Sequence, residues 1–136
     1  MNKFPQTIKS ILLTTAIVAS SMSVTLADGF KQRKGDDIYA ALCASCHMPD
    51  GNGAIGAGMY PSFIKNEKLA SKAYPQVVVL YGLNGMPALG GVLDDEQVAN
   101  VINYVRQEFG KYNDDIVTAE EVSLLRISNY EYNDLN

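Results

Sequence analysis

The most regular pattern of apolar and polar positions lies in the second half of the chain, where it predicts an amphipathic helix between Asp94 and Gly110. Apolar side chains recur there at intervals of three and four residues, which places them on one helical face; they are Val98, Val101, Ile102, Val105 and Phe109. Gln97 follows Asp94 by three residues, which is the pattern of a capping box. Gly110 is expected to end the helix as its C′ residue.

A second helix is predicted from Asp36 to about Ala44. Ile38, Ala41 and Leu42 have helical spacing and are expected on its inner face. This helix leads directly into the only two cysteines of the chain.

Residues 66–81 predict two short helices that separate near Tyr74 and Pro75. Proline has no amide hydrogen and suits the first turn of a helix, so Pro75 is placed in the first turn of the second one. The apolar run over residues 77–80 is short and β-branched, and would also fit a buried strand. We expect a helix, in keeping with the rest of the pattern.

The C-terminal part is predicted to add one small helix and a tail. Thr118 and Glu121 form a second capping-box pattern, for a helix that runs through about Ile127. Residues 128–136 are rich in Asn, Asp and Tyr, which is typical of a disordered or loosely attached segment.

Two glycine-rich stretches, residues 49–61 and 82–91, are predicted to be irregular loops. Gly51, Gly53 and Gly56 have the spacing of a dinucleotide-binding fingerprint, but no strand precedes them, as that motif requires. Their role is instead to let the backbone pass close to a flat, bulky group. Alternation typical of strands is not found in the sequence.

The start of the chain has the organisation of a secretory signal peptide. Lys3 and Lys9 precede the apolar run Ile11–Val24, and small residues lead up to a cleavage position after Ala27. An uncleaved anchor is the alternative, but the run is shorter than the ~18–20 residues of a spanning helix. Three parts are therefore expected: a signal peptide (1–27), one domain (28–127) and a polar tail (128–136).

The charge balance argues against nucleic acid and against anionic membrane surfaces as partners. The 136 residues carry a net charge of −4, which becomes −6 when cleavage after Ala27 removes two lysines. A negative surface repels phosphate backbones and anionic lipids. It permits docking to a partner that has a basic patch.

The chemistry of the chain is concentrated in Cys43-Ala44-Ser45-Cys46-His47. The spacing C-x-x-C-H is the attachment sequence of a c-type haem. The two thiols add across the haem vinyl groups, and the histidine that follows is placed to bind iron from one side. In bacteria this attachment takes place outside the cytoplasm, which agrees with export to the periplasm.

Three other interpretations of these cysteines remain. A thioredoxin-like C-x-x-C pair normally lies in a βαβ context, which the sequence lacks. A structural zinc site needs four soft ligands, whereas the chain contains two cysteines and one histidine. A disulfide between Cys43 and Cys46 would leave His47 without a role.

A second axial ligand for iron is sought among the methionines that follow the motif. Met48 is adjacent to His47 and cannot reach the opposite face, and Met59 lies only twelve residues further on. Met86 follows His47 by 39 residues, in a loop between Gly85 and Pro87, which is enough chain to wrap around a haem. The alternative for any single methionine is that it fills the core.

His/Met ligation would have a functional consequence. A thioether sulfur favours ferrous iron and raises the reduction potential. Six-coordinate iron has no vacant position for a substrate, which suits outer-sphere electron transfer.

These residues resemble the small bacterial class I cytochromes c over about residues 35–126. The resemblance is carried by the haem motif, Gly51-Asn52-Gly53, Tyr60-Pro61-Ser62-Phe63, Asn84-Gly85-Met86-Pro87 and Leu93 to Arg106. The segments 86–106 and 117–120 look most like the cytochrome subunits of periplasmic alcohol, aldehyde and sugar dehydrogenases.

The resemblance implies an all-α cytochrome c fold of about four to five helices around one haem c, with its N- and C-terminal helices crossing. Cys43 and Cys46 would hold the porphyrin, and His47 and Met86 would be the axial ligands. Pro61 matches the family proline whose backbone carbonyl accepts the proximal imidazole N–H, a bond that orients the ring. Four further residues are candidates near the haem, although ordinary packing would explain them equally: Tyr60, Tyr81, Asn84 and Arg106.

The sequence thus predicts a periplasmic, monohaem electron carrier without catalytic chemistry of its own. Its partners would be redox proteins, with a dehydrogenase as donor and an oxidase or reductase as acceptor. One alternative is a cytochrome subunit fixed in a dehydrogenase or reductase complex. Another is a ligand-binding haem sensor, which requires that Met86 does not bind iron.

Overall fold

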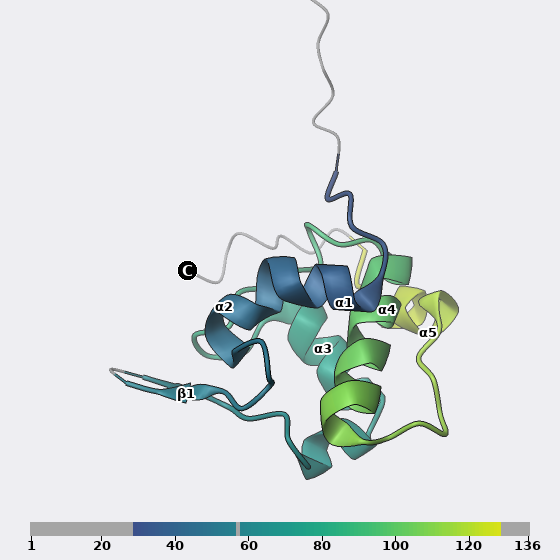
Figure 1. Cartoon of the computed structure of the whole chain (residues 1–136). Helices are drawn as coiled ribbons and strands as arrows, with labels where there is room; N and C mark the ends of the chain where they lie inside the picture. Colours follow the sequence, from purple (N-terminus) through teal and green to yellow (C-terminus); the bar gives the residue numbers. More distant parts are fainter. Residues whose placement is uncertain (1–28, 57, 129–136) are drawn as a thin grey trace, which may run out of the picture.

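The computed structural model describes residues 29–56 and 58–128, and in this part of the chain helices pack around α4 (Figure 1). Helix α4 (Asp95–Val105) continues into the π-helical turn η3 (Arg106–Gly110). All five predicted stripe residues are buried, and the predicted capping box is present. The Asp94 carboxylate accepts a hydrogen bond from the Gln97 amide, and the Gln97 side chain accepts one from the Asp94 amide, both at 2.9 Å.

The end of this helix differs from the prediction. Gly110 belongs to the last turn, and the left-handed residue that ends it is Lys111, with φ of 65°. A Cβ atom on Gly110 would lie 2.9 Å from the Tyr112 ring and 3.2 Å from Leu69. Close packing, not a positive φ, therefore calls for glycine at position 110.

The predicted first helix is confirmed and is longer than expected. It consists of α1 (Gly35–Ile38), the π-helical η1 (Tyr39–Cys43) and α2 (Ala44–His47), so the whole motif is helical. Ile38 is buried and Leu42 packs against the core, but Ala41 is exposed, contrary to the prediction. Tyr39, directly after Ile38, is 2% exposed and takes the place in the core that Ala41 was expected to have.

The first helix crosses α4 at Gly35. A Cβ atom at this position would lie 2.3 Å from the Asn100 carbonyl oxygen and 2.7 Å from the Cβ of Tyr104. Only glycine lets the two helices approach this closely. The crossing positions the start of the helix that carries the cysteines and His47.

Helices also form over residues 67–81, where the strand alternative is wrong. The 3-10 turn η2 (Glu67–Ala70) and helix α3 (Ala73–Tyr81) are separated by two residues, earlier than the predicted break at Tyr74–Pro75. Pro75 is the third residue of α3 and lies in its first turn, where the helix needs no amide donor. The prediction of its place in the first turn is therefore confirmed.

The predicted C-terminal helix is α5 (Ala119–Leu125), and it begins with the expected capping box of Thr118 and Glu121. Val122 is fully buried and Leu125 packs against the core. Helix α5 lies beside α4 in Figure 1 and contacts it.

A short hairpin lies in the stretch predicted to be irregular. Strands β1 (Ala54–Ile55) and β2 (Met59–Tyr60) pair antiparallel and project from the helical part (Figure 1). Ile55 is 89% exposed and Met59 is 74% exposed. Backbone hydrogen bonds, not burial, hold these strands together, so no pattern of apolar residues in the sequence predicts them.

The predicted signal peptide and nearly all of the predicted tail lie outside the described residues. Of the tail, the structure describes only Ser128, which is exposed. Among the described residues, no helix combines the length and apolar character required to cross a membrane.

Candidate functional site

The two cysteines lie on consecutive turns at the end of the first helix, both partly buried. Both thiols are free, which gives no support to a disulfide between them. Burial and, to a smaller extent, the nearby Cys46 raise the pKa of the Cys43 thiol to about 11. Cys43 is therefore protonated at neutral pH, in the form that exchanges poorly with disulfides.

His47 follows as a buried residue, 8% exposed. Its Nδ1 lies 3.1 Å from the Pro61 carbonyl oxygen, the contact that the family resemblance implies. A carbonyl oxygen can only accept, so Nδ1 must carry the proton in this hydrogen bond. Nε2 of the neutral ring then has a free lone pair, as required of a metal-ligating histidine whose other nitrogen is held by a backbone carbonyl.

Aromatic side chains pack against the His47 ring. Phe63 stacks on it with 4.2 Å between ring centroids and 23° between planes. Phe63 in turn contacts Phe109 and Tyr39, each with 6.3 Å between centroids. The Tyr39 hydroxyl donates to the Met48 carbonyl oxygen at 2.7 Å, and burial raises the pKa of this tyrosine, so the donor stays protonated.

The supporting role of Tyr39 and Phe63 has no signal in the sequence beyond their aromatic character, because most of the rings they contact lie far away along the chain.

Two glycines after the motif allow close contacts with protein groups. Gly51 has φ of 70°, and a Cβ atom there would lie 2.7 Å from the Phe109 ring. Gly53 has φ of 69°, and a Cβ atom there would lie 2.2 Å from the Tyr60 carbonyl oxygen. The Gly53 amide also donates to the His47 carbonyl oxygen at 3.0 Å. Gly53 therefore lets the segment 60–61 lie close to His47, and Gly51 lets the backbone pack on Phe109, whereas the sequence suggested an approach to the cofactor.

The methionine loop, residues 82–91, is fixed by backbone hydrogen bonds. Leu83 and Met86 exchange two of them, at 3.0 and 3.1 Å, across a tight turn. Gly82 has φ of 74°, and a Cβ atom there would lie 2.6 Å from the Met86 carbonyl oxygen. Leu89 and Gly90 then donate back to α3, so both sides of the Met86 turn are held to the same helix.

The three methionines occupy different environments. Met59 lies in β2 and is 74% exposed, and Met48 directly follows His47 with φ of 65°. Met86 is partly buried and is the only one of the three in a loop anchored to the last turn of α3.

Two of the four additional candidates have structural roles. Arg106 is 3% exposed, and its guanidinium donates to the carbonyl oxygens of Leu69, Ala70 and Asp115. The Tyr81 hydroxyl donates to the Leu125 carbonyl oxygen. Packing therefore accounts for Arg106 and Tyr81, while Tyr60 and Asn84 are exposed.

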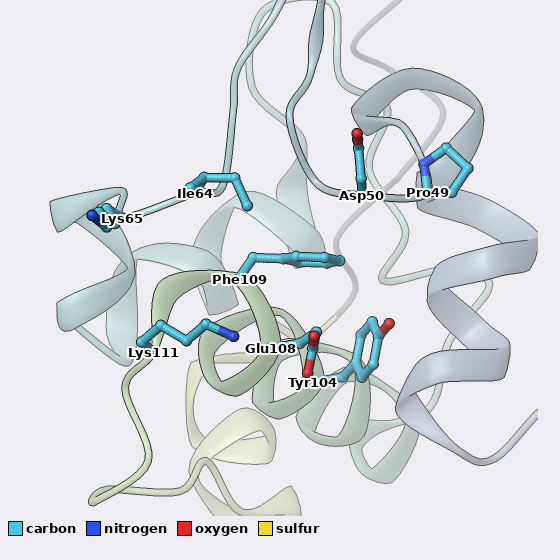
Figure 2. A pocket seen from close by; sticks show the side chains of 8 residues that line it. All are labelled: Pro49, Asp50, Ile64, Lys65, Tyr104, Glu108, Phe109 and Lys111. Atoms are coloured by element: carbon cyan, nitrogen blue, oxygen red, sulfur yellow. The ribbon is translucent and has the colours of Figure 1, made fainter.

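A surface cavity of about 360 Å³ lies behind the motif, on the side of η3 (Figure 2). Phe109 forms its centre, with Lys65 and Lys111 to one side and Asp50 to the other. Neither the cysteines nor His47 nor Met86 lines it, so this hollow is separate from the predicted haem site.

The donor set fits a covalently attached haem better than another metal group. Two free thiols stand three positions apart, the neighbouring imidazole has the tautomer for ligation through Nε2, and a thioether is held in an anchored loop. Among the described residues, no three His, Cys, Asp or Glu side chains cluster as metal ligands, so a zinc site is unsupported. Such a set defines the class of c-type cytochromes.

Comparison with known families agrees. Residues 30–105 match the family described as cytochrome c oxidase, cbb3-type, subunit III, and the chain belongs to this family of c-type cytochromes. Cytochrome c6 of a Synechococcus species is 32% identical over 106 residues, which cover 74% of this chain and 86% of that protein.

Longer proteins are similar as well. The fructose dehydrogenase cytochrome subunit of Gluconobacter japonicus is 35% identical over 59% of this chain and 19% of its own length. The match thus spans about a fifth of that subunit. A solved structure of cytochrome c6 from the diatom Phaeodactylum tricornutum aligns with a TM-score of 0.44 and 37% identity, covering 52% of this chain and 85% of that one.

The protein is therefore an electron-transfer protein with the cytochrome c fold and covalently attached haem c. This confirms the predicted class, fold, cofactor and type of function.

Proposed function

We propose that this protein carries single electrons between redox proteins in the periplasm and performs no catalysis of its own. Cys43 and Cys46 would hold the haem through thioethers, and His47 and Met86 would bind its iron. The bound haem supplies a one-electron couple between ferrous and ferric iron. The chain's part is to fix both ligands, so that little moves when the oxidation state changes.

The observation that carries this proposal is the hydrogen bond from His47 Nδ1 to the Pro61 carbonyl oxygen. It sets the tautomer and the ring orientation together. The stacked Phe63 limits rotation of the ring further. The backbone hydrogen bonds around Met86 fix the loop that would present the second ligand.

Export is part of the proposal. The order of basic, apolar and small residues up to Ala27 supports a cleaved signal peptide, followed by one domain to residue 127 and a short polar tail. The mature protein should then start at Asp28 and be released by osmotic shock. An intact Met1 on membrane-bound protein would instead show that residues 11–24 act as an anchor.

A fixed subunit of a dehydrogenase is the second candidate. It is favoured by the similarity to the cytochrome subunits of fructose dehydrogenase and of the gluconate 2-dehydrogenase of Pantoea cypripedii, of which this chain spans 25%. The carrier is preferred because cytochrome c6 matches over most of its own length.

The two candidates are separated by the state of the native protein. A carrier should elute from size-exclusion chromatography of periplasmic extract as a free protein near its own mass. It should also accept electrons from a partner that is removable by salt, because the mature chain is acidic. Co-elution with a flavin- or quinone-containing subunit that resists salt would overturn the carrier in favour of the subunit.

A further inference from the structure

The segment after the family match contacts the methionine loop at both of its ends. We define residues 119–127 as the C-terminal clamp. The family match covers residues 30–105, and the clamp lies after it. It is formed by α5 and the two residues that follow it.

The first contact is made directly before the loop. Tyr81 is the last residue of α3, and its hydroxyl donates to the Leu125 carbonyl oxygen at 2.5 Å. The same hydroxyl accepts a hydrogen bond from the Ile127 amide at 2.8 Å. One side chain thus ties the end of α3 to the backbone of the clamp.

The second contact is made at the end of the loop. Arg126 donates through Nη1 to the Gly90 carbonyl oxygen at 2.5 Å and through Nη2 to that of Leu93 at 3.1 Å. Its Nε lies 2.7 Å from a carboxylate oxygen of Asp95, the first residue of α4. The rigid guanidinium therefore joins the end of the loop, the start of α4 and the clamp.

The clamp has its own anchorage, which does not involve the loop. Val122 is fully buried. Lys72, at the other end of α3, forms ion pairs with Glu121 at 2.5 Å and with Asp115 at 2.9 Å. A segment that is held independently can restrain the loop against movement.

We propose that the C-terminal clamp sets how readily Met86 leaves the iron, with Tyr81 and Arg126 as positioning residues. This rests on the proposed function, in which Met86 is the sixth ligand. The haem would be held by covalent bonds to Cys43 and Cys46, whereas Met86 would be held to iron by one coordinate bond and by its loop. Opening of that loop is a local unfolding event, and contacts at its two ends determine its free energy.

The test compares holoprotein variants that cut the contacts to the loop with one that loosens the clamp elsewhere. Tyr81→Phe removes a single hydroxyl, and Arg126→Gln removes the guanidinium. Lys72→Met is the matched control, because it removes the ion pair with Glu121 of the clamp, together with the one to Asp115, at the end of α3 remote from the loop. Three quantities are measured: the rate of carbon monoxide binding to the reduced protein, the far-red sulfur-to-iron band across a pH titration, and the melting temperature.

Arg126→Gln should accelerate carbon monoxide binding about tenfold, as expected from losing hydrogen bonds to a charged group. Tyr81→Phe should accelerate it less, and both variants should lose the far-red band at lower pH than the unmutated protein. Lys72→Met should lower the melting temperature without changing the rate or the band. If Arg126→Gln does not fold, the rate of carbon monoxide binding to Tyr81→Phe decides the test by itself.

Equal rates of carbon monoxide binding in all variants would overturn the proposal. A Lys72→Met variant that binds carbon monoxide faster, in proportion to its fall in melting temperature, would overturn it as well. Failure of the proposed function looks different. In that case the unmutated protein itself lacks the far-red band and binds carbon monoxide rapidly.

Discussion

Replacing Gly35 by alanine tests whether the helix crossing determines the geometry of the haem-binding helix. The added Cβ would lie 2.3 Å from the Asn100 carbonyl oxygen, about 1 Å closer than ordinary contacts allow, and this partner is backbone that cannot rotate away. Forcing extra volume into such a position costs about 3 kcal/mol. Alanine regains up to about 1 kcal/mol of helix propensity.

The net loss expected for Gly35→Ala is therefore about 2 kcal/mol in the free energy of unfolding. It corresponds to a fall of about 10 °C in melting temperature for a domain of this size. Guanidinium unfolding of the holoprotein, followed by far-UV circular dichroism, measures the free energy directly.

Gly56→Ala is the matched control, because a Cβ atom at Gly56 meets nothing within 4 Å. It should change the free energy of unfolding by less than about 0.5 kcal/mol. Equal stabilities of the Gly35 and Gly56 variants would refute the argument that the crossing requires glycine.

Two further predictions concern the helix cap and haem attachment. The pKa of Asp94 is lowered, because burial, which raises it, is outweighed by the hydrogen bonds from the Gln97 amide and Arg33. The ionised Asp94 carboxylate therefore stabilises the folded protein above the unfolded carboxyl pKa of about 3.9, and this stabilisation is lost as the pH falls through the lower pKa of the folded state. Asp94→Ala should thus lower the free energy of unfolding by about 1 kcal/mol at neutral pH and by much less in strong acid. Urea unfolding at a series of pH values measures this difference. A loss that is the same at every pH would contradict the lowered pKa of Asp94. Haem should stay with the denatured unmutated chain in acidified organic solvent and be released from the Cys43→Ala, Cys46→Ala variant; haem extracted from the unmutated chain would contradict thioether attachment.

Features that depend on neighbouring residues were predictable from the sequence. The stripe on α4 and the capping boxes at Asp94 and Thr118 follow from spacings of three and four residues, and they occur as predicted. The haem motif was equally accessible because all of its donors lie within five residues.

Features that arise from contacts between distant segments were not predictable. Gly35 shows no local sign that α4 passes over it. The hairpin of β1 and β2 buries little, so it lacks a pattern. Arg126 lies 33 residues or more from the carbonyl groups it binds, and no local rule connects them.

The most direct test of the account is the identity of the sixth iron ligand. The oxidised, unmutated protein should show the weak sulfur-to-iron charge-transfer band in the far red, and the reduced protein should bind carbon monoxide poorly. Met86→Ala should abolish the band, lower the reduction potential and permit rapid carbon monoxide binding, whereas Met59→Ala should change none of these. An unmutated protein that binds carbon monoxide readily, with a spectrum that Met86→Ala leaves unaltered, would contradict the electron carrier and favour a gas-binding protein.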